Sequence, residues 1–332
     1  MIIATAAGRC GIVGNPTDMY GGTVISCSTV ERATTTIMPD TPDTIITVGG
    51  VSQTLTTVSD LTPRGDYLDV VRGVLTALEI DPASMPPFHL TSETEIPMQA
   101  GLAGSTAILG TIVGSVLAYL EFRLNPYQTA ELIRKIEYDV LKIVCGFQDH
   151  YMTVFGGVNY MDFRDKISSN VQDQDSPFAT IEPLSKYVTD IPILLAHTGV
   201  KHHSGTVHKS IRERWLEGEP AVVDGYTEIA KLAREGKKAL LECDWELLGR
   251  LMTRNHAIQR ELGGSGESNE HLIAAALSGG AIAAKLAGAG GGGTIMALTL
   301  DPERTEAALL KAGADKILRP KPSRGLTVEV RI

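Results

Sequence analysis

The sequence predicts an α+β fold, and three observations lead to that expectation. Residues 2–6 and 23–38 are rich in β-forming side chains. Gly49-Gly50 separates two further strand-like runs, which is a hairpin signal. The second half of the chain alternates long helix-like segments with a few strands. Strands that gather in one part of a chain and helices in another are typical of α+β proteins.

Composition narrows the class of protein. A chain of 332 residues with 43% hydrophobic and 21% charged residues is ordinary for a globular protein of two domains or one large one. A net charge of -9 without a local Lys/Arg cluster argues against nucleic-acid binding. The four cysteines are widely spaced and form no CxxC pair, which argues against a zinc site and a disulfide framework.

The N-terminal third begins with an apolar run that lacks a basic region and is interrupted by Arg9. We therefore expect a first strand instead of a signal peptide, and a cytoplasmic location. Residues 8–22, GRCGIVGNPTDMYGG, are dense in Gly, Asn, Pro and Asp, which predicts a loop. The following elements are expected to be strands at 43–48 and 52–58, a helix from Asp66 to Glu79, and a strand at 88–95.

Residues 96–119, IPMQAGLAGSTAILGTIVGSVLAY, join a glycine-rich turn to a long helix-compatible run. Such a turn at a helix N-terminus exposes unpaired backbone N–H groups at the positive end of the helix dipole, which suits a phosphate. Gly101 and Gly104 let the backbone approach an anion closely. An ordinary buried helix is the main alternative. A membrane span is the third, because about twenty mostly uncharged residues are long enough to cross a bilayer.

The rest of the chain is expected to contain a helix from Pro126 to Val144, then a loop, a short helical turn and a strand within 146–163. Residues 165–190 are polar, so we place a domain boundary there, with domains at 1–185 and 186–332. The expected elements beyond it are a strand at 191–196, helices at 206–217, 219–241, 244–262, 268–278 and 302–312, a strand after Gly293, and a final strand at 325–331.

A third glycine-rich loop, Gly288 to Gly293, formally matches GxGxxG. A dinucleotide-binding loop of that type opens a helix, whereas a strand-like run follows here, so a Rossmann fold is rejected. No GxxxxGK[ST] motif occurs, which rejects a P-loop NTPase. Close approach of the backbone to a ligand or to another loop is the expected reason for four consecutive glycines.

Together, the loops GRCGIVGNPTDMYGG (8–22), PMQAGLAGSTAI (97–108) and KLAGAGGGGTI (285–295) resemble the three motifs of the GHMP small-molecule kinases, in the family's order. Segments such as QDHYMTVFGGVNYMDF and HSGTVHKSIRERWLEGE resemble the glucuronokinase-like sugar 1-kinases within that family. The resemblance implies a two-domain fold, with a ribosomal-protein-S5-domain-2-like N-terminal half and a ferredoxin-like C-terminal half.

The resemblance also implies an activity: transfer of phosphate from ATP, with Mg²⁺, to the anomeric hydroxyl of a sugar acid such as D-glucuronate. Alternatives are another GHMP kinase, acting on a heptose phosphate, galacturonate or a mevalonate-type alcohol, or a non-catalytic nucleotide-binding sensor. A small sugar or sugar acid is then the expected partner, without nucleic acid or membrane. The chain is expected to act as a monomer or homodimer.

Site residues follow from the same resemblance. Asp149 and Arg9 match the catalytic aspartate and its basic neighbour, and Ser105 and Glu137 match the metal ligands. Phosphoryl transfer needs these groups, because an oriented hydroxyl, a metal and charge stabilisation do most of the catalysis. The residues expected at the nucleotide are Pro97, Gly101, Leu102, Ala103, Gly104, Ser105, Thr106, Gly290 and Gly291, and those expected at the substrate are Asn15, Asp18, Lys201 and His203.

Structural roles remain open for several of these residues. Asp149 is also placed to cap a helix, Glu137 to face solvent, and Arg9 to end a strand. His150 is interpreted as structural. The carboxylate of a sugar acid would need a cation, for which the candidates are Lys201, His202, His203, Arg212 and Arg214.

Overall fold

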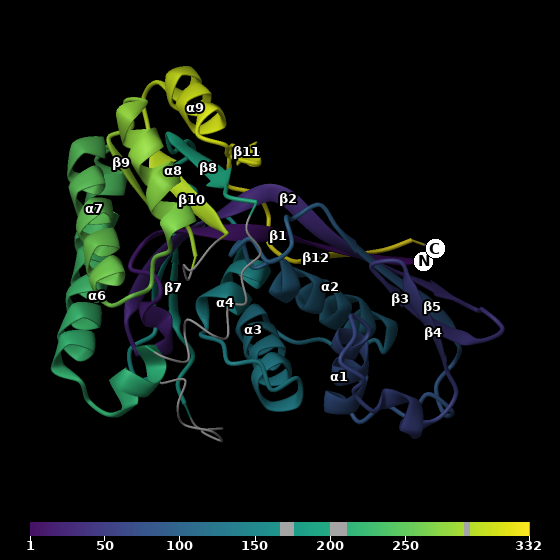
Figure 1. Cartoon of the computed structure of the whole chain (residues 1–332). Coiled ribbons are helices and arrows are strands. Elements are labelled where there is room, and N and C mark those ends of the chain that lie inside the picture. Colours follow the sequence, from purple (N-terminus) through teal and green to yellow (C-terminus); the bar gives the residue numbers. More distant parts are fainter. Residues whose placement is uncertain (167–175, 200–210, 289–292, 332) are drawn as a thin grey trace.

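A computed structural model describes residues 1–166, 176–199, 211–288 and 293–331. The chain forms two sheets with helices packed on them, as Figure 1 shows. The first sheet has eight strands and the second has four. The expectation of an α+β fold is confirmed.

The larger sheet has the strand order β12-β1-β2-β5-β3-β4, and β6 and β7 extend it from the N-terminal half of β2. Strand β2 has 17 residues, so its two halves pair with different neighbours, β6 and β5. All pairs in this sheet are antiparallel except β3 with β5. The strands are β1 (Ile2–Val13), β2 (Thr23–Pro39), β3 (Thr44–Val48), β4 (Val51–Leu55), β5 (Phe88–Thr94), β6 (Val158–Asp162), β7 (Thr180–Pro183) and β12 (Thr327–Val330).

Strand β1 is longer than the sequence indicates, because it continues to Val13 through the segment expected to be a loop. The glycines in this segment obscure the strand pattern. Residues Arg9, Cys10 and Gly11 pair with Ser28, Cys27 and Ser26 after a shift in register. Irregularities of this kind re-aim side chains near functional sites. The first motif is therefore part of a strand up to Val13, and only the residues after it form a loop with the short helical turn η1 (Thr17–Met19).

Helices cover one side of this sheet, and α2 (Gly104–Tyr119) is the central one. It packs on β1 and β2 and is flanked by α1 (Asp69–Ala77), α3 (Pro126–Lys135) and α4 (Gln148–Phe155). A helix surrounded in this way has no need of a polar face, and its apolar run is accounted for by burial. Among the residues with an assigned structure, no helix combines the length and apolar composition required to cross a membrane.

The prediction of one helix from Pro126 to Val144 is wrong in its second half, where the α-helix has already ended. Helix α3 begins with Asn125 and Gln128 in a reciprocal capping box and ends at Lys135. One π-helical turn, η3 (Ile136–Val140), follows it. A π-turn inserts a residue into the helical repeat and commonly occurs at functional sites. Here it carries Glu137.

The second sheet has the order β11-β8-β10-β9, with every pair antiparallel. Helices precede β9 and α9 separates β10 from β11, which gives the β-α-β-β-α-β succession of a ferredoxin-like unit. The elements are β8 (Ile193–His197), α6 (Pro220–Leu241), α7 (Trp245–Glu261), α8 (Glu267–Ser278), β9 (Ala283–Leu286), β10 (Thr294–Leu298), α9 (Pro302–Lys311) and β11 (Lys316–Leu318).

The C-terminal strand pairs with the N-terminal one. Strand β12 lies beside β1, and the amino group of Met1 donates to the carbonyl of Arg331 at 2.8 Å. The two termini lie side by side in Figure 1. The division at 185/186, which falls between β7 and β8, stays a prediction. The return of β12 means that the last strand of the second half lies in the first sheet.

A buried lysine joins the two halves. The ammonium of Lys285, on β9, donates to the carbonyl of Gly11 at 3.0 Å, to Oδ1 of Asn15 at 2.8 Å and to the carbonyl of Leu286 at 2.6 Å. Three acceptors match the three N–H donors of an ammonium group. Burial opposes the charge and lowers the pKa of Lys285 to about 7.

We predict that Lys285→Met lowers the free energy of unfolding by about 3 kcal/mol or more, because two carbonyls and an amide oxygen lose a buried donor. Urea unfolding of the variant and of wild type measures the difference. Lys231→Met, on the exposed face of α6, is the matched control and should change stability by less than about 0.5 kcal/mol. Equal effects of the two substitutions would contradict the role given to Lys285.

Candidate active site

A cavity of about 500 Å³ opens between β1, the turn before α2, and the segment that leads into α4. Arg9, Asp18 and Asp149 are among the residues that line it. The residues of the glycine-rich turn and the start of α2 that line it are Met98, Gln99, Ala100, Gly101, Leu102, Ala103, Gly104, Ser105 and Thr106.

The glycine-rich turn is wound so that backbone amides, not side chains, meet the cavity. Gln99, Gly101 and Ala103 all have positive φ, and α2 begins at Gly104 with no side-chain cap at Ala103. The first N–H groups of α2 therefore have no intrahelical partner and point along the positive end of the helix dipole. The side chain of Ser105 is exposed at this point. The arrangement is suited to a polyphosphate.

The third glycine-rich loop supports this turn from behind. A Cβ on Gly288 would lie 2.5 Å from the carbonyl oxygen of Gly101, and one on Gly293 would lie 2.8 Å from that of Ala100. Only glycine allows two backbones to approach so closely. Loop-to-loop contact is therefore one reason for the glycines at the ends of that motif.

Arg9 and Asp149 form a bidentate ion pair at the cavity wall. Nε of Arg9 donates to Oδ1 of Asp149 at 2.7 Å, and Nη2 donates to Oδ2 at 2.9 Å. Nη1 of the same arginine donates to the carbonyl of Gly101 at 2.6 Å. Arg9 is 6% exposed, whereas the Asp149 side chain is 28% exposed, so the carboxylate is the accessible member. A planar guanidinium fixes both the position and the plane of that carboxylate.

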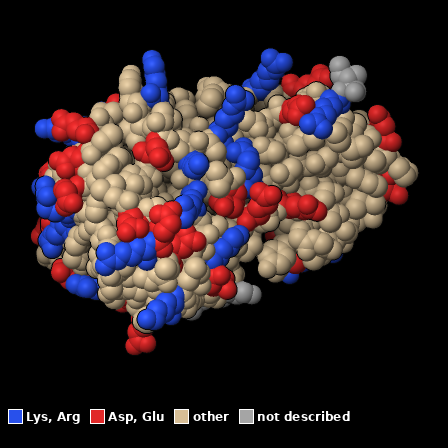
Figure 2. All heavy atoms as spheres, turned by 90° about the horizontal axis from the view of Figure 1, so that it is seen from above, with Lys and Arg blue, Asp and Glu red and all other residues tan. Residues whose placement is uncertain are grey.

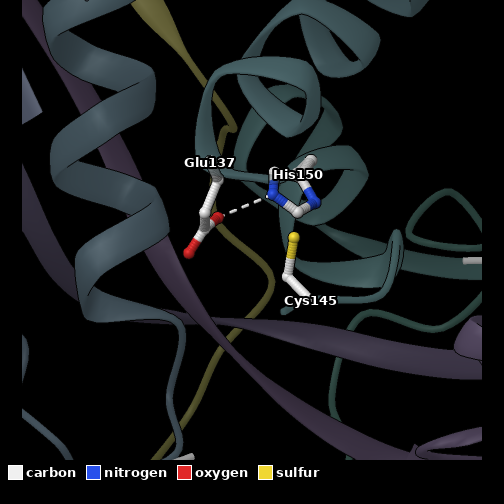
Figure 3. A group of neighbouring side chains, drawn as sticks. All are labelled: Glu137, Cys145 and His150. Carbon is white, nitrogen blue, oxygen red and sulfur yellow. Dashed lines mark hydrogen bonds and ion pairs between the residues drawn. The ribbon is translucent and has the colours of Figure 1, made fainter. Parts of the chain in front are cut away.

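Glu137 is held from two sides, through the same oxygen. Its Oε2 accepts from Oγ1 of Thr106 at 3.1 Å and lies 2.7 Å from Nε2 of His150. Figure 3 shows the imidazole facing this carboxylate, whose second oxygen points away from His150. Because a carboxylate can only accept, Nε2 must carry the proton. Within the described residues, Nδ1 of His150 has no hydrogen-bond partner.

Cys145 is the third member of this group. Ligand atoms of Glu137, Cys145 and His150 all lie within 4.8 Å of one another, and the sulfur sits beside the imidazole in Figure 3. Burial and the nearby charge of Glu137 raise the pKa of the Cys145 thiol well above its ordinary value. A protonated thiol is a poor ligand. The cavity instead offers Mg²⁺ the oxygen donors it prefers, from the Glu137 carboxylate and the Ser105 hydroxyl.

Asp18 organises the start of α4. Its Oδ2 accepts from the backbone N–H of Phe147 at 2.8 Å and of Gln148 at 3.0 Å. Burial is the main reason that the pKa of Asp18 is raised, to about 6, and the charge of Asp149 adds to it, while the two N–H donors and Arg9 act in the opposite direction. Asp18 therefore holds the helix turn that carries Asp149 in place.

The structure brings together most of the residues that the sequence indicates. Pro97 and Asn15 do not line the cavity. Asn15 is 2% exposed, and its side chain contacts Lys285 and the carbonyl of Gly288, so its amide is used between the two halves of the chain. Four expected residues, Gly290, Gly291, Lys201 and His203, lie outside the described residues. The expected residues that line the cavity are Arg9, Asp18, Gly101, Leu102, Ala103, Gly104, Ser105, Thr106, Glu137 and Asp149.

Three contacts are not evident from sequence reasoning, although Thr106 itself is among the residues expected at the nucleotide. The contact of His150 with Glu137 joins α4 to η3, and η3 is itself the π-turn that changes the helical register. The hydroxyl of Thr106 points to Glu137, 31 positions away. Lys285 has no signal beyond its position beside the third glycine-rich motif. Only the neighbouring motifs could have drawn attention to these residues.

On the face that Figure 2 shows, acidic and basic side chains are intermingled, without an extended field of one sign. This face therefore offers no broad surface of a single charge to a partner.

Family models match both halves of the chain. The model described as GHMP kinases N terminal domain matches residues 69–157, and the model described as GHMP kinases C terminal matches residues 237–316. The chain is 35% identical over 210 residues to probable glucuronokinase 2 of Arabidopsis thaliana, which covers 61% of this chain and 55% of the plant protein. The match thus spans about half the length of that relative.

The names of other relatives indicate different acceptors. Mevalonate kinase of Pyrococcus horikoshii is 30% identical over 243 residues, covering 71% of this chain and 67% of the relative. The crystal structure of a D-glycero-D-manno-heptose 1-phosphate kinase from Bacteriodes thetaiotaomicron superposes with a TM-score of 0.77 at 20% identity, over 100% of both chains. Matching models in both halves, and a fold shared over the full length, show that this chain belongs to the GHMP kinase family.

Proposed function

We propose that the protein is an ATP-dependent sugar kinase that phosphorylates the anomeric hydroxyl of a sugar acid, as glucuronokinases do with D-glucuronate. The observation that carries this proposal is the Arg9–Asp149 pair, which holds an accessible carboxylate against a cavity walled by a glycine-rich helix start. The glycine-rich helix start suits phosphates, and the Asp149 carboxylate suits a hydroxyl nucleophile. These are the two reactants of a phosphoryl transfer.

The nucleotide's phosphates would lie on the amides that begin α2, between Gly101 and Thr106. The Glu137 carboxylate and the Ser105 hydroxyl would hold Mg²⁺, which supplies charge neutralisation for the phosphate oxygens when bound. Thr106 and His150 fix the orientation of Glu137 through the contacts to its Oε2. Such support of a ligand by neighbouring donors keeps its remaining oxygen in position.

Asp149 would orient the acceptor hydroxyl and accept its proton. The hydroxyl oxygen forms a bond to the γ-phosphorus, the bond from that phosphorus to the bridging oxygen breaks, and ADP leaves with the electron pair. The proton passes from Asp149 to solvent. Arg9 keeps the carboxylate aligned and places positive charge beside the transferring group, where negative charge is redistributed.

The acceptor is the finer part of the proposal. The match to the plant glucuronokinase supports a sugar acid, and the segments that resemble that branch support the same choice. The matches to a mevalonate kinase and to a heptose phosphate kinase keep those acceptors as outcomes of the test. A non-catalytic sensor is less favoured, because Asp149 and Glu137 are both present and both line the cavity.

An assay that couples ADP release to a spectroscopic signal tests the proposal directly. The acceptors to compare are D-glucuronate, D-galacturonate, neutral hexoses, heptose phosphates and mevalonate. D-Glucuronate should give the highest kcat/KM. If another alcohol is phosphorylated and no uronate is, the choice of acceptor is wrong. If no acceptor in the panel causes ADP release, the proposed kinase activity is wrong.

We predict that Asp149→Asn lowers kcat by about 100- to 10,000-fold, because the amide cannot accept the acceptor's proton. Titration calorimetry with a non-hydrolysable ATP analogue should show affinity within about threefold of wild type. Asp224→Asn, on the exposed side of α6, is the control and should retain full turnover. Near-normal kcat in Asp149→Asn would remove Asp149 from the chemistry.

A second prediction concerns Thr106→Val, which keeps the side-chain shape and removes the donor to Glu137. The Mg²⁺ concentration for half-maximal rate, at saturating ATP, should rise by about tenfold or more. Ser115→Ala removes a buried hydroxyl from the same helix, where it donates to the carbonyl of Ile112, and should leave the Mg²⁺ dependence unchanged. The same Mg²⁺ dependence in Thr106→Val and wild type would show that Thr106 does not position a metal ligand.

A further inference from the structure

This inference rests on the proposed function and concerns how a sugar acid is distinguished from a neutral sugar. An acid differs from the corresponding neutral sugar by one carboxylate, which needs a donor of matching charge. The helical residues 211–216 include two arginines, Arg212, which contacts Tyr138 of the first half of the chain, and Arg214, which contacts residues of the second half. The two arginines differ in their hydrogen-bond partners.

Arg214 makes strong structural contacts. Its Nε and Nη2 donate to the two oxygens of Glu219, both at 2.7 Å, and its Nη1 donates to the carbonyl of Leu262 at 2.8 Å. The charge of Arg214 is thus already paired with a carboxylate in bidentate geometry. Arg214 therefore ties its helix to the neighbouring helices.

Arg212 makes much weaker contacts. Its Nη2 lies 3.4 Å from the hydroxyl of Tyr138, at the limit of a hydrogen bond. Its Nε is buried and has no hydrogen-bond partner in the described parts of the chain. A guanidinium carries five N–H donors, and a buried donor without an acceptor costs free energy. A ligand with an anionic acceptor would relieve that cost.

The hydroxyl of Tyr20 is a second buried polar group that lacks a hydrogen-bond partner among the described residues. The Tyr20 ring packs against Trp215, with centroids 5.0 Å apart, and Trp215 lies one helical turn from Arg212. Burial and Asp18 raise the pKa of Tyr20, whereas the charge of Arg212 acts in the opposite direction, which places the arginine within electrostatic reach of that hydroxyl.

Neither tyrosine lines the cavity itself, but each directly follows a residue that does. Tyr138 follows Glu137 in η3, and Tyr20 follows Met19 at the end of η1. Glu137 and Met19 both line the cavity. Arg212 contacts Tyr138, and Trp215 of the same helix packs on Tyr20, so the arginine lies near two elements that contribute lining residues to the cavity.

We propose that Arg212, with the hydroxyls of Tyr20 and Tyr138, forms a carboxylate-binding subsite for the acceptor. One guanidinium and two neutral hydroxyls match a singly charged, planar carboxylate. A phosphate dianion would call for a further cation. The subsite would hold the acid group at one end of the sugar while Asp149 meets the anomeric hydroxyl at the other. Arg212 then determines specificity and takes no part in the bond-making steps.

Binding without turnover tests the subsite independently of the kinase reaction. Methyl α-D-glucuronoside and methyl α-D-glucoside have no free anomeric hydroxyl and differ in the carboxylate, so titration calorimetry with each, in the presence of an ATP analogue and Mg²⁺, isolates its contribution. Wild type should bind the glucuronoside roughly 10- to 100-fold more tightly. Arg212→Gln should abolish that preference, and Arg212→Lys should restore part of it. Arg214→Gln, the matched control, should retain the preference.

Three outcomes would overturn the subsite: equal affinities in wild type, an unchanged preference in Arg212→Gln, or a larger Arg212-dependent preference for methyl α-D-glucoside 6-phosphate. Unchanged affinity of Arg212→Gln for the ATP analogue shows that the variant is folded. Kinetics with D-glucuronate provide a separate test. In Arg212→Gln the KM for D-glucuronate should rise, while the KM for ATP should stay constant. A binding preference without turnover in wild type would contradict the proposed kinase and leave the subsite supported.

Discussion

The bidentate contact between Arg9 and Asp149 is the interaction on which the rest of the site depends. Arg9 comes from the middle of β1, Asp149 from the first turn of α4, and the third contact of Arg9 reaches the carbonyl of Gly101 in the turn before α2. One guanidinium thus connects the strand, the helix carrying the carboxylate and the glycine-rich turn. Its rigid, always charged fork suits this task in a way that lysine does not.

The surroundings restrict each of these elements further. Asp18 accepts two N–H groups at the start of α4 and so sets the position of Asp149. Lys285 and Asn15 connect β9 to the end of β1, and Gly288 lets the third loop rest against Gly101. The glycine-rich turn before α2 is therefore held by both halves of the chain, so its geometry depends on motifs that are far apart in the sequence.

The sequence was sufficient to predict the features that depend on local chemistry. The glycine-rich turn before α2, the positions of most helices and the α+β class follow from composition, spacing and turn residues. The candidate pair Arg9 and Asp149 followed from the resemblance to a family. The extension of β1, the π-turn that carries Glu137, and the contacts of Thr106 and His150 with that carboxylate could not be predicted, because they depend on pairing and packing between distant segments. The same reason separates Arg212 from Arg214, which look alike in sequence.

The central claim is that the carboxylate held by Arg9 directs phosphate from ATP to the anomeric oxygen of a sugar acid. The most direct measurement is phosphorus NMR of the product formed from ATP, Mg²⁺ and D-glucuronate labelled with carbon-13 at C1. We expect a new phosphate monoester resonance that is split by coupling to the labelled carbon. A phosphate ester formed at any other hydroxyl, or no ester at all, would contradict it.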